Sequence, residues 1–510
     1  MSWSAGYVTE LDYTYGYYSE LNPHYAGFVL LDAGFAVPQW QHACELGFGQ
    51  GMSVNLHAAA GSTQWYGNDF NPQHAAFARQ LAADCGNGAQ LSDESFAEFC
   101  ARDDLPLFDF IGLHGIWSWI SPQNQALIVD FVRRKLRVGG VLYISYNTLP
   151  GWAAFAPLRQ LFVQHAERMS APGLGVEAQV KNALAFSQQL LAVAPRALAD
   201  DKLRERLTRI AGQDPHYLAH EYFNRDWTPM YFADMAAALA PAKLGYACQA
   251  STLEQVPVLH YTPEQQALLD GTADPLFRET VRDYILNQQF RRDYWIKGPR
   301  RLQPAEQDAR WGQQRVALAL PRSEVKMKLA LPRGTINLTP AVYDPVLDCL
   351  ADGQPHLLSE LAAKVQRSCR GSQFREVIRV LVGARMLLAL PPQATGSRTV
   401  AARINNFILQ QAVHSSRFAA LASPELGGGV AVSRFSQCFL QAYLAGECHA
   451  DTMAATLDAR LQANGERVAH QGQALASRDA QRQYLQDLAQ RFLDHELPLL
   501  RGWGLLDQAG

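Results

Sequence analysis

Several features are missing from this sequence, and each absence excludes a class of protein. Its 510 residues include eight cysteines, but no two stand in a Cys-x-x-Cys or another ligand spacing, so a zinc ribbon and an iron–sulfur cluster are excluded and no metal site is expected. No basic segment followed by an apolar one opens the chain, and no uncharged apolar run approaches the length of a membrane span. We therefore expect a cytoplasmic protein with buried free thiols and no membrane insertion.

An excess of basic residues is also missing. Lys and Arg total 45 against 48 Asp and Glu, which gives a formal net charge of −3. Nucleic-acid-binding domains usually carry a basic excess, so a nucleic-acid partner is not expected. With 48% hydrophobic residues, the chain can bury ample core, and its length predicts roughly three domains.

An acid-led glycine turn is the feature around which the rest of the chain is arranged. Glu45 precedes Gly47 and Gly49, with a third glycine two residues further on. The pattern predicts a strand over 37–43 before the turn and a helix over 52–60 after it. Glycines let a ligand approach the backbone, and a helix start presents free N–H groups to it. The alternative is a turn that only closes a strand–helix corner.

Acidic residues follow the next two predicted strands. Asp69 ends a strand over 64–69, about 20 residues beyond the glycine turn, where an acid suits a ribose diol. Asp93 and Glu94 follow a third strand near 88–91. For this pair, the alternative is that Asp93 or the serine before it caps the next helix.

The next two strands complete a pattern of alternating strands and helices. A fourth strand over 107–113 ends at His114, a helix begins near 122, and a fifth strand follows a glycine pair at 139–140. The site candidates stand at the carboxyl ends of strands, as in a doubly wound α/β sheet. The sequence therefore predicts an α/β, Rossmann-like fold for this part of the chain.

The acid-led Gly-x-Gly-x-Gly turn and the later acids resemble class I S-adenosylmethionine-dependent methyltransferases. A nicotinamide-binding dehydrogenase is disfavoured because its fingerprint is Gly-x-Gly-x-x-Gly. Further segments resemble bacterial methyltransferases that carry a methyltransferase regulatory domain, a group that includes lysine methyltransferases of outer-membrane proteins. These segments are residues 114–119, 145–152, 220–223 and 423–429. The chain departs from many members by having Phe48 in the glycine turn where they carry Cys or Ser.

This resemblance implies a cofactor, S-adenosyl-L-methionine, and a role for each candidate residue. The amino-acid part of the cofactor would lie against Glu45, Gly47 and Gly49, and the ribose against Asp69. Asp93, with Glu94 as the second choice, would contact the adenine. The residues expected to line the methyl-transfer channel are His114, Trp117, Tyr146 and Asn147.

A tyrosine-rich arm, residues 13–23, precedes the predicted sheet. One interpretation is that the arm, with Tyr15 as a cofactor contact, folds over the cofactor and helps to enclose its sulfonium. A desolvated contact between a cation and an aromatic face contributes around 2 kcal/mol. The other interpretation is a packing strap that covers the edge of the sheet.

The remaining segments read as insertions and additions to the catalytic fold. Two strands, 244–248 and 290–297, look like the last of the sheet, so the helical segments before and between them are insertions. Three helices followed by a strand resemble a winged helix, in which Arg375 and Arg379 would lie on the recognition segment. The expected division is a methyltransferase fold at 1–300, with its cofactor core at 36–152 and lid insertions at about 153–240 and 251–289, a linker and winged-helix-like domain at 301–395, and a helical C-terminal domain at 396–510.

The expected activity is methyl transfer to a protein lysine by an enzyme that the resemblance implies to be a homodimer. A lysine amine must be neutral to react, and an apolar, aromatic pocket lowers the pKa of its ammonium form, so no dedicated base is required. One alternative is a methyltransferase for a small molecule, such as a phenol or a carboxylate. Another is a non-catalytic DNA-binding protein that senses S-adenosylmethionine.

Overall fold

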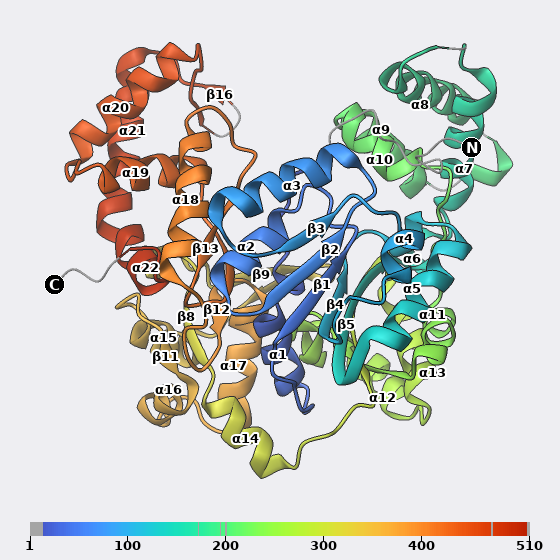
Figure 1. Cartoon of the computed structure of the whole chain (residues 1–510), viewed down its shortest axis with the longest axis horizontal. Coiled ribbons are helices and arrows are strands. Elements are labelled where there is room, and N and C mark those ends of the chain that lie inside the picture. The colour runs from blue at the N-terminus through green and yellow to red at the C-terminus, as the bar shows by residue number, and fades with distance from the viewer. Residues whose placement is uncertain (1–13, 172, 194, 199–200, 471–472, 507–510) are drawn as a thin grey trace.

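A seven-stranded sheet forms the centre of the molecule (Figure 1). The computed structural model describes residues 14–171, 173–193, 195–198, 201–470 and 473–506, so Tyr13 of the arm lies outside the described residues. The strands lie in the order β3-β2-β1-β4-β5-β7-β6, with β7 antiparallel to both of its neighbours. Their bounds are β1 His42–Leu46, β2 Gln64–Asn68, β3 Gln90–Ser92, β4 Phe108–Leu113, β5 Leu136–Asn147, β6 Leu244–Gln249 and β7 Phe290–Lys297.

Helices cover both faces of this sheet because its strands are apolar on both sides. Phe110 and Ile111 are adjacent in β4 and belong to the two different cores. One face is covered by α1 (Pro23–Asp32), α2 (Met52–Ala60) and α3 (Pro72–Cys85), and the other by α4 (Phe96–Ala101), α5 (Pro122–Lys135) and α11 (Phe232–Leu239). The predicted α/β, doubly wound fold is confirmed.

The first strand begins later than the sequence pattern suggests. The prediction of a strand over 37–43 is wrong, because β1 spans His42–Leu46 and ends directly at the glycine turn. Cys44, Glu45 and Leu46 are buried between the two helical layers. The sequence pattern predicts Glu45 in the turn, whereas in the structure it lies near the end of β1.

The first helical insertion forms a separate unit beside the sheet. Aromatic residues around Trp152 and Phe155 fill its core. The helices are α6 (Leu149–Trp152), α7 (Ala156–Met169), α8 (Val176–Ala192), α9 (Asp201–Ala211) and α10 (Pro215–Tyr222), and α12 (Pro263–Asp270) and α13 (Pro275–Leu286) lie between β6 and β7 in the chain. Helices α7 to α10 lie at the upper right of Figure 1, whereas α12 and α13 lie at the lower right.

The winged-helix-like region packs directly on the sheet domain. Its strands β8 (Arg315–Leu318), β11 (His356–Leu357) and β12 (Leu387–Leu390) form a small antiparallel sheet, and the other elements are α14 (Pro304–Gly312), β9 (Lys328–Leu331), β10 (Gly334–Asn337), α15 (Pro340–Cys349), α16 (Leu358–Val365) and α17 (Ser372–Gly383). Both arginines on α17 are engaged within the chain. Arg379 pairs with the buried Asp32 of α1 at 2.7 Å, and Arg375 pairs with Asp308 at 2.6 Å.

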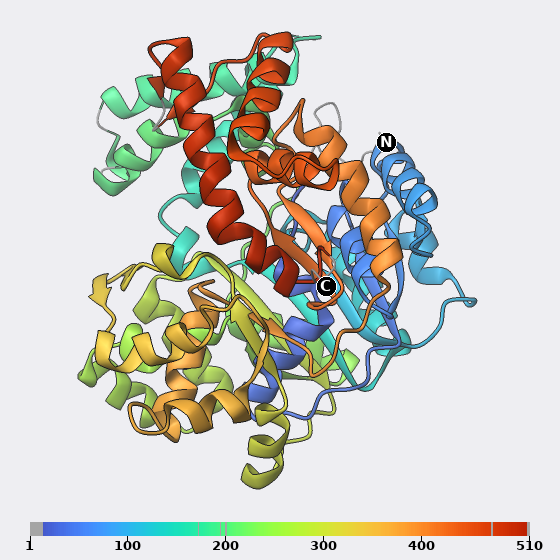
Figure 2. The same ribbon diagram turned by 90° about the vertical axis from the view of Figure 1, so that its left-hand side faces the viewer.

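The sequence predicts a helical C-terminal part. The structure differs, because this part also contains a β-hairpin. The hairpin, β13 (Ala420–Ser423) and β14 (Gly428–Ala431), lies against α2. The other elements are α18 (Arg398–Ala412), α19 (Arg434–Leu444), α20 (Ala450–Ala463), β15 (Ala469–His470), β16 (Gln473–Ala474), α21 (Arg478–Arg491) and α22 (Leu497–Gly502). Figure 2 shows this part stacked on the winged-helix-like region.

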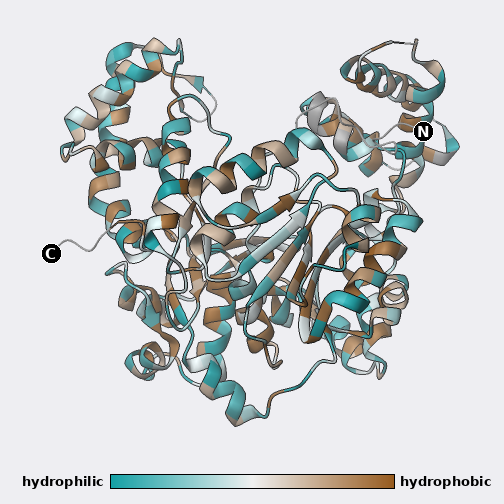
Figure 3. Ribbon diagram, viewed as in Figure 1, coloured by the Kyte–Doolittle hydropathy of each residue, from teal (hydrophilic) through white to brown (hydrophobic). Residues whose placement is uncertain are grey.

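A single hydrophobic core joins these C-terminal regions to the sheet domain. It includes Phe28 of α1, Leu56 of α2, Leu381 of α17 and Ile408 of α18. Figure 3 shows that hydrophobic and hydrophilic residues alternate around the helices. Within the described part of the chain, no helix is both long and apolar enough to span a membrane.

Candidate functional site

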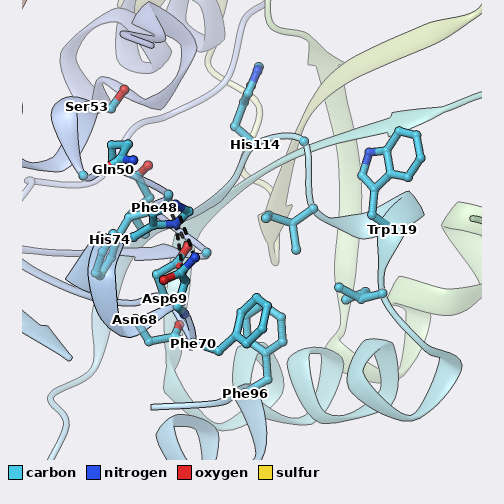
Figure 4. A pocket seen from close by; sticks show the side chains of 18 of the residues that line it. Phe48, Gln50, Ser53, Asn68, Asp69, Phe70, His74, Phe96, His114 and Trp119 are labelled. Atoms are coloured by element: carbon cyan, nitrogen blue, oxygen red, sulfur yellow. Dashed lines mark hydrogen bonds and ion pairs between the residues drawn. The ribbon is translucent and has the colours of Figure 1, made fainter. Parts of the chain in front are cut away.

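A cavity of about 260 Å³ opens at the carboxyl ends of β1, β2 and β4 (Figure 4). Its lining comes from the glycine turn, the ends of the neighbouring strands, the N-terminal arm and the segment after β4. The lining residues that carry the argument are Tyr18, Glu45, Asp69, His114, Trp119 and Asp226. The carboxyl ends of parallel strands are where open α/β sheets bind their ligands.

The glycine turn requires glycine at more than one position. Gly47, Gly49 and Gly51 all have positive φ, at +68°, +57° and +71°. A Cβ on Gly51 would lie 2.5 Å from the Cβ of Ala78 in α3. The turn is held in place because the backbone N–H of Gly47 donates to the carbonyl of Asn68 at 2.8 Å. These residues leave the helix start of α2 bare toward the cavity.

Glu45 is a buried acid for which the described protein supplies no cationic partner. Only 4% of its surface is exposed, and within the described residues its Oε2 atom has no hydrogen-bond partner. Burial, and second the nearby carboxylate of Asp69, raise the pKa of Glu45 to about 8. An orphaned buried carboxylate in a cavity wall is suited to a cationic ligand.

Asp69 holds the glycine turn while facing the cavity. Its Oδ2 accepts from the N–H of Gly49 at 2.8 Å, and its Oδ1 accepts from the N–H of Asn71 at 3.0 Å. The ring of His74 lies 3.4 Å from the same Oδ1. A carboxylate has about four lone-pair sites, so capacity is left for further donors.

His114 is held by aromatic neighbours at the end of β4. Its ring stacks on Tyr18 with centroids 3.7 Å apart, and its Nδ1 lies 2.8 Å from the hydroxyl of Tyr143. Burial lowers the pKa of His114 to about 4, so the ring is neutral at physiological pH. A neutral imidazole here can orient a ligand but adds no positive charge to the cavity.

The outer part of the cavity combines aromatic and apolar residues with one acid and with the polar side chains of Ser95, Ser121 and Asn124. Phe96 begins α4, and Ile116 and Trp119 follow β4, while Asp226 comes from the chain after α10. Figure 4 shows Phe96 and Trp119 on opposite sides of this region. The cavity lining, all of it within the described residues, includes the three carboxylates of Glu45, Asp69 and Asp226 but no lysine or arginine.

Five of the residues that the sequence predicted for the site line this cavity: Glu45, Gly47, Gly49, Asp69 and His114. All five stand at the ends of β1, β2 and β4 or in the turn directly after β1. Their common position follows from the parallel arrangement of those strands.

The two acids predicted for an adenine contact, Asp93 and Glu94, lie outside the cavity lining. Asp93 is largely exposed and lies 3.9 Å from Arg79. The side chain of Glu94 accepts from Ser92 at 2.8 Å and pairs with Arg102 at 3.2 Å. The β3 end is turned so that the chain after these acids, including Phe96, faces the cavity instead.

Three predicted channel residues also lie outside the lining and serve in packing. Trp117 is buried and its Nε1 donates to the sulfur of Met230 at 3.0 Å. The hydroxyl of Tyr146 donates to Asp293 at 2.8 Å, inside the sheet. Asn147 is buried at the end of β5, and its N–H donates to the side chain of Ser118.

Tyr15 faces away from the cavity, so its predicted cofactor contact is not supported by its position. Its ring packs edge-on against Phe77 and Phe418, at 5.3 and 5.1 Å between centroids. Its neighbour Tyr18 lines the cavity instead. The aromatic composition of the arm signals an enclosing segment, but only the backbone direction decides which ring faces inward.

Sequence reasoning missed Tyr18, Trp119, Phe96 and Asp226. Tyr18 and Trp119 lie within segments that the sequence had singled out, two or three positions from the predicted residue. Asp226 has no local signal, because it belongs to an insertion brought to the cavity by the fold. Among the described residues, no cluster of three or more His, Cys, Asp or Glu side chains could hold a metal.

Comparisons with known proteins agree with this geometry. The uncharacterized protein sll1526 of Synechocystis sp. is 36% identical over 515 residues, covering 99% of this chain and 100% of that protein. The protein RP789 of Rickettsia prowazekii is 27% identical over 197 residues, covering 37% of this chain and 34% of that protein. The model of a family described as "Predicted methyltransferase regulatory domain" matches residues 214–297.

Solved structures show the same fold over almost the whole chain. PKMT2 from Rickettsia typhi in complex with AdoHcy superposes with a TM-score of 0.69 at 18% identity, covering 97% of this chain and 99% of that one. A second structure of PKMT2 gives a TM-score of 0.65, also at 18% identity, covering 96% of this chain and 99% of the other. The likeness therefore extends through the winged-helix-like and C-terminal regions.

Proposed function

From the premise that this chain belongs to the family of the Synechocystis protein sll1526 and has the class I methyltransferase fold with a regulatory domain, we propose that it methylates protein lysine side chains with S-adenosylmethionine as donor. The uncompensated carboxylate of Glu45 beside the glycine turn carries this proposal. When bound, the donor supplies an electrophilic methyl group on a sulfonium.

The residues of the inner cavity fit the donor. The buried Oε2 of Glu45 has no partner within the described protein, and the α-ammonium of the donor would supply one. Gly47 and Gly49 leave room for the amino-acid part beside the backbone. Asp69 keeps lone pairs for the ribose hydroxyls, although its two bonds to backbone N–H groups are already made.

The outer cavity supports a cationic amine as acceptor. Asp226 is an acid in the same lining as Phe96 and Trp119, and it pairs with the exposed Arg225 at 3.2 Å. No lysine or arginine stands among the lining residues to attract an anion. An ammonium group would be drawn in by the carboxylates, and an apolar surrounding would then lower its pKa and favour the neutral, nucleophilic amine. Phe96 and Trp119 would hold the aliphatic part of a lysine side chain and exclude water.

The part of the protein in this step is alignment rather than acid–base catalysis. The amine nitrogen, the methyl carbon and the sulfur must be collinear, so the rate depends on positioning in a dry site. His114 is neutral and is fixed between Tyr18 and Tyr143. We assign it an orienting role at the end of β4.

The two alternative functions receive less support. A phenolate or carboxylate acceptor would meet three carboxylates and no cation in the cavity lining. A DNA-binding role would need the arginines of α17, but Arg375 and Arg379 are paired with acids of the chain itself.

Isotope labelling would test the proposal. Methyl-deuterated S-adenosylmethionine would be incubated with the protein and a lysine-containing peptide library, and a matched library with every lysine replaced by arginine would serve as control. We expect the deuterated methyl on lysine Nζ in the first library alone. Asp226→Asn should raise the KM for the peptides several-fold, with an unchanged Kd for the donor. Label confined to small molecules, or equal labelling of both libraries, would contradict a lysine acceptor.

A further inference from the structure

The arm before α1 connects the cavity to the C-terminal region. Residues 14–18 carry no helix or strand, and Tyr18 at their end has an extended backbone. Thr14, Gly16 and Tyr18 line the cavity, whereas Tyr15 and Tyr17 face the other way. Successive residues of an extended chain point to opposite sides, so this alternation follows from the backbone. We call residues 14–18 the strap.

The inner side of the strap fixes residues of the cavity. The N–H of Tyr18 donates to the hydroxyl of Ser53 at the start of α2, at 3.0 Å. The ring of Tyr18 stacks on His114. Just beyond, the carbonyl of Glu20 accepts from Tyr294 of β7 at 2.8 Å. The strap therefore forms one wall of the cavity and positions the residue at the end of β4.

The outer side of the strap is held by the C-terminal hairpin. The hydroxyl of Tyr17 accepts from the backbone N–H of Gly429 in β14 at 2.9 Å and lies 3.3 Å from Nε2 of His57 in α2. Tyr15 is clamped between Phe77 of α3 and Phe418, which lies just before β13. Both outward tyrosines thus contact the C-terminal region.

The hairpin approaches the strap so closely that only glycine fits. A Cβ on Gly429 would lie 2.6 Å from the ring of Tyr17. The two glycines before it are equally close to the segment that follows the strap. A Cβ on Gly427 would contact the side chain of His24, and a Cβ on Gly428 would contact that of Asn22. Burial lowers the pKa of His57 to about 3 and that of His24 to about 4, so both rings are neutral at this interface.

We infer that the β13–β14 hairpin completes the donor site by holding the strap against it, with Tyr17 as the positioning residue. This inference rests on the proposed function, because it takes the cavity to be the S-adenosylmethionine site. It assigns the C-terminal region a role in donor binding, although none of the described residues of that region lines the cavity. Loosening the hairpin would weaken donor binding and leave the acceptor side intact.

Tyr17→Phe is the central variant, because it removes only the hydroxyl that bonds to Gly429 and His57. A neutral hydrogen bond contributes about 0.5–1.5 kcal/mol, so the Kd for S-adenosylmethionine and for AdoHcy, measured by calorimetry on the full chain, should rise roughly three- to tenfold. Tyr443→Phe is the matched control: its hydroxyl accepts from Arg501 at 2.8 Å, within the C-terminal region. We expect that control to bind both ligands as the parent does.

Three further readouts separate positioning from general destabilisation. In Tyr17→Phe, the KM for the donor should rise more than the KM for the lysine peptides, and hydrogen exchange should accelerate at residues 14–18. Gly429→Ala should raise the Kd for the donor further, because its Cβ meets the Tyr17 ring. Parent-like Kd values in Tyr17→Phe, or unchanged hydrogen exchange at residues 14–18, would overturn the inference alone. If the parent bound neither ligand, the proposed function would fall as well.

Discussion

Replacing Glu45 with glutamine removes a buried group that can ionise and keeps the shape of the side chain. In the free protein, burial and the neighbouring Asp69 raise the pKa of Glu45 to about 8. The α-ammonium of the donor needs the ionised carboxylate, so binding must first remove a proton from Glu45 at any pH below 8. The affinity of the parent protein should therefore rise with pH, and complex formation should release a proton.

The size of this effect follows from the pKa. At pH 6, two units below the pKa, ionising Glu45 costs about 2.7 kcal/mol, and at pH 7.5 it costs about 0.8 kcal/mol. The Kd of the parent should thus fall roughly twentyfold to thirtyfold between pH 6 and pH 7.5. A charged hydrogen bond contributes about 1.5–3 kcal/mol. Glu45→Gln should bind several-fold more weakly than the parent at pH 7.5, and as tightly or more tightly at pH 6.

Calorimetric titration with S-adenosylmethionine from pH 6 to 7.5 would measure this, because the donor's own α-ammonium stays mostly protonated in that range. Repeating the titration in buffers of different ionisation enthalpy counts the released protons, and we expect close to one near pH 7 for the parent and none for Glu45→Gln.

The raised pKa of Glu45 also affects folding stability. In the folded protein Glu45 keeps its proton up to about pH 8, whereas in the unfolded chain it loses the proton at a lower pH. Glu45 therefore costs stability as pH rises toward 8, and the glutamine variant should be no less stable there. A pH-independent Kd in the parent, or the same slope in both proteins, would refute the reasoning.

Two further predictions concern stability, and urea unfolding measures both. Gly51→Ala and Gly465→Ala place a side chain at nearly the same backbone angle, with φ of +71° and +70°, but only at Gly51 would the new Cβ lie against another atom, 2.5 Å from Ala78. Both should lose about 1–2 kcal/mol to the left-handed conformation, and Gly51→Ala should lose about 1–3 kcal/mol more through overpacking; equal losses would count against the close contact. Arg291→Met leaves the buried carboxylates of Asp283 and Asp293 without their cation and should cost about 3–5 kcal/mol. Arg133→Met breaks an exposed pair and should cost at most about 1 kcal/mol, so a similar loss in both arginine variants would argue that the buried network contributes little.

The sequence by itself determined the inner cavity. The apolar strands alternate with helices, and a residue directly after a parallel strand lies at the carboxyl edge of the sheet. Glu45, Gly47, Asp69 and His114 were predictable for this reason, and the local pattern also located the helix that begins at residue 52.

The same pattern was less reliable for residues a few positions further along the chain. In an extended segment, a shift of one residue turns a side chain to the opposite side. That is why Tyr18 rather than Tyr15 lines the cavity. Trp117 and Trp119 lie in one 3-10 turn, where side chains two positions apart point in different directions, and of the two only Trp119 lines the cavity. Composition marked both segments as aromatic, but the direction of each ring depends on what the backbone packs against.

Only the tertiary structure decided what comes from distant parts of the chain. Asp226 reaches the cavity from an insertion, and the hairpin meets the strap across more than 400 positions, with the hydroxyl of Tyr17 bonded to Gly429. No local periodicity reports such contacts, because they depend on burying one shared core between α1, α2 and the C-terminal helices. Short sequence motifs therefore determine which residues form the inner cavity. The packing of the domains determines which residues enclose it.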